Sequence, residues 1–312
     1  MKKIIGYLKL FHVEYFNWVL YLFVALFIAA LIAFNYYFDF EDSYIDSFYG
    51  KHVRALLFFA YHALAFYGVL LIIWLHDKSK MKITWQFLLK SAIGLAILGF
   101  DRSVFPFISK LVLNNFNRVD YRFYFKILYN LYGLFTIGFA LFLVKLFFDP
   151  KGGDGLYGLK FRNAGIKPYW IMLAIMVPVV FIGTYLPGFL EYYPTFKRSG
   201  GGEFASFHAL PQAVGIVLYE IAYLFDFLNT ELFFRGFLVI GLSKMLGKNV
   251  VLPMAATYAV LHFGKPMGEA ISSVFGGYIL GIIALYSRNI WGGVFIHGGI
   301  ALLMELFAFW RQ

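Results

Sequence analysis

Long apolar stretches alternate with short polar or basic segments along the whole chain. About 20 apolar residues in a helix cross a bilayer, and most of these stretches approach that length. The pattern predicts an all-α, polytopic helical membrane protein with eight or nine transmembrane helices. The predicted helices cover residues 16–38, 55–75, 83–100, 127–144, 169–190, 204–248 (longer and more polar), 250–263, 270–287 and 289–304.

The composition supports a membrane protein. Hydrophobic residues make up 61% of the chain and charged residues 14%, whereas an ordinary soluble domain carries roughly 25% charged residues. Too few polar residues are present to cover a water-soluble fold. The chain has no cysteine, which excludes disulfides, thiolate metal sites and cysteine nucleophiles. We expect a multi-pass protein of the cell membrane, in contact with the lipid bilayer.

The net charge of +10, from 27 Lys and Arg against 17 Asp and Glu, concentrates in short segments beside apolar stretches. This distribution follows the positive-inside rule for cytoplasmic loops, so we expect no nucleic-acid partner. The mixed-charge stretch 101–122 predicts an interfacial helix on the opposite side. If each apolar stretch crosses once, the basic segments share one face and the N-terminus is cytoplasmic. These segments are 2–9, 78–82, 151–167, 244–248 and 288.

A glycine-rich, basic segment at 149–167 separates two parts of different character. We expect transmembrane helices without a recognisable motif in 1–150, a basic loop, a transmembrane helix and an external loop in 151–210, and a catalytic helical core in 211–312. Ionisable residues inside apolar stretches occur mainly in the last part, where their cost in hydrocarbon indicates function. A single helix over 211–246 would be about 54 Å long, so we predict a break or sharp tilt near 226–230, which would place Glu231 at a helix start.

Four ionisable residues in apolar surroundings form the candidate site: Glu231, Arg235, His262 and His297. Glu231 and Arg235 are four residues apart and so share a helix face. If the chain turns at MLGKN as an antiparallel hairpin, Glu231 and His262 both lie about 20 Å from that turn. His297 lies about 12 Å beyond the turn at 288–289. The spacing therefore predicts that these groups meet at a similar depth.

Such a set can activate water. A desolvated glutamate can act as a general base, and a neutral histidine can share that role or donate a hydrogen bond to an oxyanion. Arg235 would order Glu231, or the two would form only a structural ion pair. Glu231, His262 and His297 could also hold Zn²⁺ with an open fourth position, although the HExxH signature is absent. A zinc-dependent and a metal-free mechanism both stay open.

Other small or acidic residues near the four have structural interpretations. Glycines 292, 293, 298 and 299 permit close helix approach in lipid. Glu269 follows the helix-breaking GKP and suits a helix N-terminus. Glu220 and Glu305 are further buried carboxylates, for which capping or hydration is the simpler role.

Four motifs resemble those of the CPBP family of intramembrane proteases, the CAAX protease and bacteriocin-processing (Abi) enzymes grouped with the metalloproteases. They are ELFFRGF, HFGKPxxE, FGGYILG and SRNIWGGVFIH, within about residues 211–306. The resemblance implies an intramembrane endopeptidase that cleaves a membrane-associated peptide or a prenylated protein. In that family, the residues matching Glu231 and His262 activate water, and the residue matching His297 stabilises the oxyanion.

The sequence also departs from the family pattern. Thr230 stands where the family has the first glutamate of a pair, Ala301 where an asparagine is common, and Tyr258 where phenylalanine is usual. Thr230 and Ala301 favour an alternative, a non-catalytic CPBP-like membrane scaffold or bacteriocin-immunity protein. A third possibility is a transporter with a buried proton relay, but the repeated halves common in transporters are not found here.

Overall fold

The computed structural model describes residues 1–78, 81–150, 153–160, 165 and 167–312, and these residues form helices and no strand. The prediction of an all-α, polytopic helical fold is confirmed. Seven helical segments are long and apolar enough to cross a membrane, and Lys167–Gly183 is a shorter apolar helix. Because the chain reverses inside one of the seven, Gln212–Leu261, the expected eight or nine crossings were a fair approximation.

The helical elements in chain order are α1 (Lys2–Tyr15), α2 (Trp18–Phe38), η1 (Phe40–Ile45), η2 (Asp46–Phe48), α3 (Val53–His76), α4 (Trp85–Leu113), α5 (Arg118–Leu131), η4 (Leu134–Phe139), α6 (Ala140–Phe148), α7 (Lys167–Gly183), α8 (Phe189–Tyr192), η5 (Thr195–Arg198), α9 (Gly201–Phe207), α10 (Gln212–Glu231), η6 (Leu232–Gly241), α11 (Ser243–Leu246), η7 (Gly247–Val250), α12 (Val251–Leu261), α13 (Met267–Ser287) and α14 (Trp291–Arg311). Of the short segments, η1, η4 and η6 are π-helical, and η2, η5 and η7 are 3₁₀-helical.

Several helix starts follow from their sequence. The side chain of Asn17 accepts hydrogen bonds from the first free backbone amides of α2, and Asn117 does the same for α5. Thr84 caps α4 in this way. Such caps replace the missing intrahelical partners of the first N–H groups, so these polar residues fix where each apolar stretch becomes helical.

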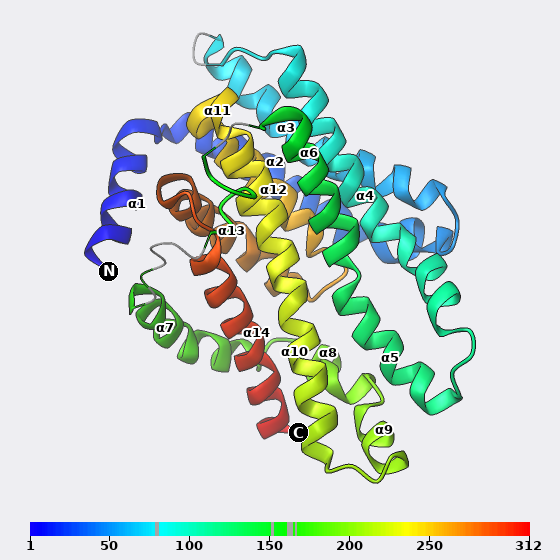
Figure 1. The fold of residues 1–312 in the computed structure, drawn as a ribbon. Helices are drawn as coiled ribbons and strands as arrows, with labels where there is room; N and C mark the ends of the chain where they lie inside the picture. The colour runs from blue at the N-terminus through cyan, green and yellow to red at the C-terminus, as the bar shows by residue number, and fades with distance from the viewer. Residues whose placement is uncertain (79–80, 151–152, 161–164, 166) are drawn as a thin grey trace.

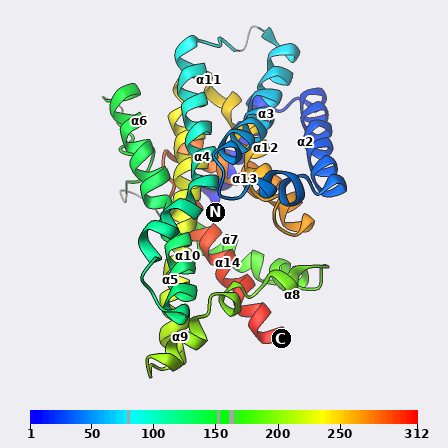
Figure 2. The same ribbon diagram turned by 90° about the vertical axis from the view of Figure 1, so that its right-hand side faces the viewer.

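The continuous helix α10–η6 runs through the middle of the molecule, with α7 and α14 on one side and α4, α5 and α6 on the other (Figure 1). Helix α12 packs between α3 and α13, and its residues 251–260 are all buried. In Figure 2, α2 and α3 lie beside α12, on the side away from α6. One hydrophobic cluster joins side chains of α2, α3 and α4 to those of η6 and α12, so the motif-free N-terminal helices share a core with the motif-bearing ones.

Two predictions about helix boundaries are wrong. The stretch 101–113 is the second half of α4 and not a separate interfacial helix. Its charges have partners inside the bundle: the carboxylate of Asp101 accepts hydrogen bonds from Thr136 and Tyr132, and Arg102 pairs with Glu41 at 2.6 Å. The charged residues Asp101 and Arg102 therefore do not mark the end of the apolar helix.

The predicted break at 226–230 is also wrong, because α10 continues through this stretch and passes directly into η6. Glu231 is the last residue of α10 and not the start of a helix. The ten residues of η6 have π-helical geometry, which is rare and frequent at functional sites. The chain turns only after Leu242, where Gly247 has a φ of +59° that suits glycine.

Ion pairs join the basic ends of several helices. Lys248 pairs with Glu14 at the end of α1, and Arg288 pairs with Asp154 at 2.6 Å. The buried Lys90 donates to the carbonyl oxygen of Gly241 at 2.8 Å. These contacts gather 14, 154, 243–248 and 288 at one end, consistent with a shared basic face. Three basic residues of the predicted face, at 80, 151 and 162, lie outside the described residues.

Candidate active site

The junction of α10 and η6 buries an ion pair. Glu231 and Arg235 have side-chain exposures of 0% and 1%, and Nη1 of Arg235 lies 2.8 Å from Oε1 of Glu231. The guanidinium also lies over the ring of Tyr258, with Cζ 4.1 Å from the ring centroid. A carboxylate at this depth requires a nearby positive group to stay charged. The structure therefore brings these two predicted residues together on one face of the helix.

Helix α14 adds His297 to the same carboxylate. Nδ1 of His297 lies 3.2 Å from Oε1 of Glu231, and Nε2 lies 3.1 Å from the hydroxyl of Tyr258. The helices can approach this closely because residue 293 is glycine: a Cβ there would lie 2.1 Å from Oε2 of Glu231. The expected role of the α14 glycines in close packing is thus seen at the site itself.

His262 directly follows α12, and its ring centroid lies 4.6 Å from that of Tyr258. Its Nδ1 lies 2.9 Å from the carbonyl oxygen of Tyr258, so Nδ1 carries the hydrogen and Nε2 is the free acceptor. The rings of His262 and His297 have centroids 6.5 Å apart. Nε2 of His262 lies 3.9 Å from Oε1 of Glu269, near the start of α13. All four predicted site residues thus belong to one cluster, with Tyr258 at its centre.

The sequence alone indicated no chemistry for Tyr258 or Glu269. Tyr258 was only a departure from a family motif, although its place four residues before His262 put the two on one helix face. Glu269 was interpreted through its helix N-terminus. Its carboxylate also accepts hydrogen bonds from Lys265 at 2.6 Å and from Tyr193 at 2.9 Å. The sequence alone did not indicate that Glu269 and Tyr193 lie beside the site.

The N-terminal helices hold the segment that follows His262. The hydroxyl of Tyr36 donates to the carbonyl oxygen of Lys265 at 2.7 Å, and the amide of Asn35 donates to that of Phe263 at 3.3 Å. Glu41 of η1 lies against Gly264, whose added Cβ would be 3.2 Å from Oε1 of Glu41. Burial raises the pKa of Glu41 to about 7, although the neighbouring Arg102 acts to lower it. Part of the site wall therefore comes from helices without a motif.

The donor set does not fit a zinc ion. Among the residues that the structure describes, no group of three or more His, Cys, Asp or Glu side chains is arranged to hold a metal. Oε1 of Glu231 instead faces the cationic Arg235, which would repel a metal ion, and Nε2 of His262 faces Glu269. The geometry therefore favours chemistry by side chains alone.

Of the two carboxylates interpreted as capping or hydrated, Glu305 has structural contacts, whereas Oε2 of Glu220 is buried without a hydrogen-bond partner among the described residues. Glu305 accepts hydrogen bonds from the backbone amides of Thr195 and Phe196, at 2.7 and 3.2 Å, and so caps the start of η5. Ala301, where the family often has asparagine, is buried in an apolar cluster that also contains Tyr223 and Phe227. On the side of Ala301, the surroundings of His297 are therefore apolar.

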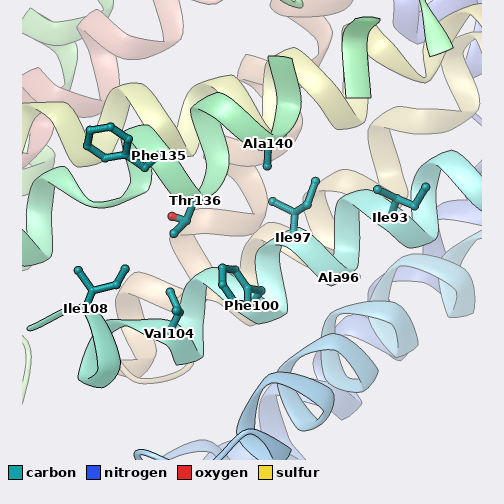
Figure 3. A pocket seen from close by; sticks show the side chains of 9 residues that line it. All are labelled: Ile93, Ala96, Ile97, Phe100, Val104, Ile108, Phe135, Thr136 and Ala140. Carbon is teal, nitrogen blue, oxygen red and sulfur yellow. The ribbon is translucent and has the colours of Figure 1, made fainter. Parts of the chain in front are cut away.

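An apolar groove of about 610 Å³ lies between α4 and η4–α6 (Figure 3). Its lining includes one hydroxyl, that of Thr136, which donates to the carboxylate of Asp101. The remaining lining residues are Ile93, Ala96, Ile97, Phe100, Val104, Ile108, Phe135 and Ala140. None of the candidate site residues lines this groove, which therefore offers no chemistry of its own.

Comparison with protein families connects the site with a known class of enzyme. Residues 211–303 match the model of the Rce1-like family, described as Type II CAAX prenyl endopeptidase Rce1-like. The match covers α10 to α14, which carry all four predicted site residues, and it agrees with the CPBP resemblance of this segment. It supports a CAAX-type intramembrane protease within a multi-pass membrane protein. No curated protein and no solved structure matches the chain.

Proposed function

We propose that this protein is an intramembrane endopeptidase that hydrolyses a peptide bond of a membrane-associated substrate. The observation that carries the proposal is the buried cluster of Glu231, Arg235, His262 and His297 around Tyr258, within the segment that matches a protease family. Desolvated acid–base groups in fixed geometry are what water activation requires. The family description makes a prenylated C-terminal peptide the first substrate class to examine.

The contacts favour a division of roles that differs from the sequence expectation. Glu231 was expected to work with His262, but its carboxylate contacts His297. In the proposed mechanism, Arg235 holds the Glu231 carboxylate in place and Glu231 orients His297. The free Nε2 of His262 accepts a proton from the attacking water. The hydroxyl of Tyr258, which lies 3.1 Å from Nε2 of His297, donates a hydrogen bond to the oxyanion of the tetrahedral intermediate, where charge develops.

Cleavage of a reporter peptide by the purified chain tests the proposal. Products of prenylated and unmodified peptides would be identified by mass spectrometry for the wild type and for Glu231→Gln and His262→Ala. Each variant should lose about 10²–10⁴-fold in kcat, the usual contribution of a positioned acid–base group. Glu191→Gln, an exposed carboxylate on α8, is the control and should keep wild-type activity. Full activity in both site variants would exclude this mechanism.

A non-catalytic scaffold is the second candidate, and it is supported by Thr230 and Ala301, where the family has polar or acidic groups. Under this function the wild type would bind a membrane partner without cleaving it, and Glu231→Gln would keep the binding. Co-purification from crosslinked membranes, compared between wild type and Glu231→Gln, distinguishes the two functions. Turnover of any peptide that depends on His262 would rule the scaffold out.

A further inference from the structure

We infer that Glu269 is a second catalytic carboxylate, which together with His262 holds the attacking water and supplies in space the acid group that is missing at position 230. The inference rests on the proposed endopeptidase function and names a further residue for it. The observation that supports it is a second carboxylate–histidine pair: Oε1 of Glu269 lies 3.9 Å from Nε2 of His262. Thr230 leaves only one glutamate at the end of α10.

The two carboxylate–histidine pairs differ in their access to water. The Glu231 side chain is 0% exposed and faces Arg235 and His297, whereas the Glu269 side chain is 16% exposed and the His262 side chain 5%. A water that bridges two groups needs room and two polar partners. Glu269 and His262 are two such partners, and their separation of 3.9 Å is too long for a direct hydrogen bond. Water is therefore more readily held at this pair than at Glu231.

Three features fix the position of the Glu269 carboxylate. Nζ of Lys265 donates to Oε1 at 2.6 Å, and the hydroxyl of Tyr193 donates to Oε2 at 2.9 Å. Glu269 also lies in the first turn of α13, where the helix dipole favours a negative charge. Each donor acts on a different oxygen and Oε1 keeps accepting capacity, so the carboxylate can still accept a hydrogen bond from water on the side of His262.

The proposed step balances as a simple hydrolysis. The bridging water donates one hydrogen bond to Oε1 of Glu269 and gives its other proton to Nε2 of His262. Its oxygen forms a bond to the peptide carbonyl carbon, and the carbonyl electron pair moves to the oxygen near His297 and Tyr258. When the intermediate collapses, the C–N bond breaks and His262 returns the proton to the leaving amine. Glu269 stabilises the imidazolium that exists between these steps.

Steady-state kinetics test the role of Glu269 in the full-length protein. With the reporter peptide, Glu269→Gln should lower kcat about 100-fold and change KM by less than about threefold. Glu269→Asp, which keeps a carboxylate, should fall between this variant and the wild type. A purely structural Glu269 would give no such partial rescue of kcat at unchanged KM.

The outcomes separate the inference from the proposed function. If the wild type cleaves, His262→Ala is inactive and folded Glu269→Gln keeps kcat within about threefold of wild type, the inference is wrong and the endopeptidase stands. If Glu269→Gln does not fold, Glu269→Asp decides instead: wild-type kcat in this variant overturns the inference. If the wild type cleaves no peptide, the proposed function fails and the inference falls with it.

Discussion

At the scale of single residues, each charged group of the site is held in position by a neighbouring residue. Arg235 lies 2.8 Å from one oxygen of Glu231, and the other oxygen of that carboxylate points at Gly293 of α14. Within the described part of the chain that second oxygen is buried and has no hydrogen-bond partner. A buried, half-satisfied carboxylate is costly, so its position depends on the space that Gly293 leaves.

Gly293→Ala should therefore impair the site without touching a charged residue. The new methyl group would lie 2.1 Å from Oε2 of Glu231, so the carboxylate or α14 must move by about 1 Å or more, which can cost about 100-fold in rate. The measurement is kcat on the reporter peptide. Gly276→Ala is the control, because a Cβ there meets no described heavy atom within 4 Å. Equal kcat in the two variants would contradict this account of Gly293.

Local spacing made part of the site predictable. The pairing of Glu231 with Arg235 follows from their separation by four residues on a helix. The similar depth of Glu231 and His262 follows from their equal distances to the MLGKN turn. Glu269 and Tyr193 were not predictable as partners of the site, because they are 76 residues apart in the chain and meet only through the packing of the loop before η5 against α13. Nothing in local sequence encodes such a meeting.

At the scale of elements, α2 supports a motif that it does not contain. The hydroxyl of Tyr36 donates to the carbonyl oxygens of Lys265 and, at 3.4 Å, of His262. This segment lies between α12 and α13 and has left the helix, so its carbonyl groups need partners from elsewhere. The N-terminal part of the chain thus positions His262, although the sequence analysis placed all function after residue 211.

Tyr36→Phe should loosen this segment. It removes one hydroxyl and leaves the carbonyl of Lys265 without that donor, which costs about 1 kcal/mol and about 2–4 °C in the thermal midpoint. We also expect a lower kcat, because His262 loses part of its support. Tyr37→Phe is a matched control, since the neighbouring Tyr37 is 82% exposed. Thermal unfolding in detergent measures the first effect, and identical midpoints for both variants would show that α2 does not support the segment.

The course of α10 shows why element boundaries were harder to predict than element types. The apolar periodicity indicated helices throughout, and the structure has them. The predicted break rested on the length of about 54 Å that a single helix over 211–246 would have. The structure instead keeps α10 and η6 continuous through the bundle, where Asn229, for example, is buried against Gly133. Packing between distant segments, which the sequence does not display, decided the boundary.

At the scale of the whole molecule, ion pairs connect the loops at one end of the bundle. Arg288 lies at the turn between α13 and α14 and donates to Asp154 and to the hydroxyl of Ser243 at 2.6 Å each. These contacts tie the segment before α7 to the segment after η6. This end carries Lys244, Lys248 and Arg288. The opposite end holds the turn between α4 and α5 and helices α8 and α9 (Figure 1).

The pair Asp154–Arg288 should make stability depend on pH in a defined direction. The hydrogen bond from Arg288 holds the pKa of Asp154 below its ordinary value of 3.8. The unfolded chain then binds more protons near that pH, so the stabilisation is present above it and is lost as the pH falls through the lower folded value. Because both side chains are partly exposed, we expect about 0.5 kcal/mol at neutral pH.

The measurement is the thermal midpoint of Asp154→Asn and wild type across pH. The difference between them should be largest at neutral pH and shrink below about pH 4. Glu203→Gln is the control, because the pair Arg122–Glu203 has side-chain exposures of 49% and 61% and should contribute nothing measurable. A difference that grows toward acid pH would show that the contact with Arg288 is not what stabilises this end.

The two ends of the bundle should also face different compartments. Basic segments flanking membrane helices stay in the cytoplasm, which assigns the end with Lys248 and Arg288 to that side. The chain has no cysteine, so single-cysteine variants report position without background. With an impermeant maleimide on intact cells, Asn115→Cys and Ser206→Cys should react, and Lys78→Cys and Gly153→Cys only after lysis. The opposite labelling pattern would mean that the protein has the inverse orientation in the membrane, and mixed labelling at either end would show that the basic segments do not share a face.

The orientation decides which compartment supplies substrate to His262 and Glu269, because a cleavage site opening toward the basic end could receive only cytoplasmic peptide ends.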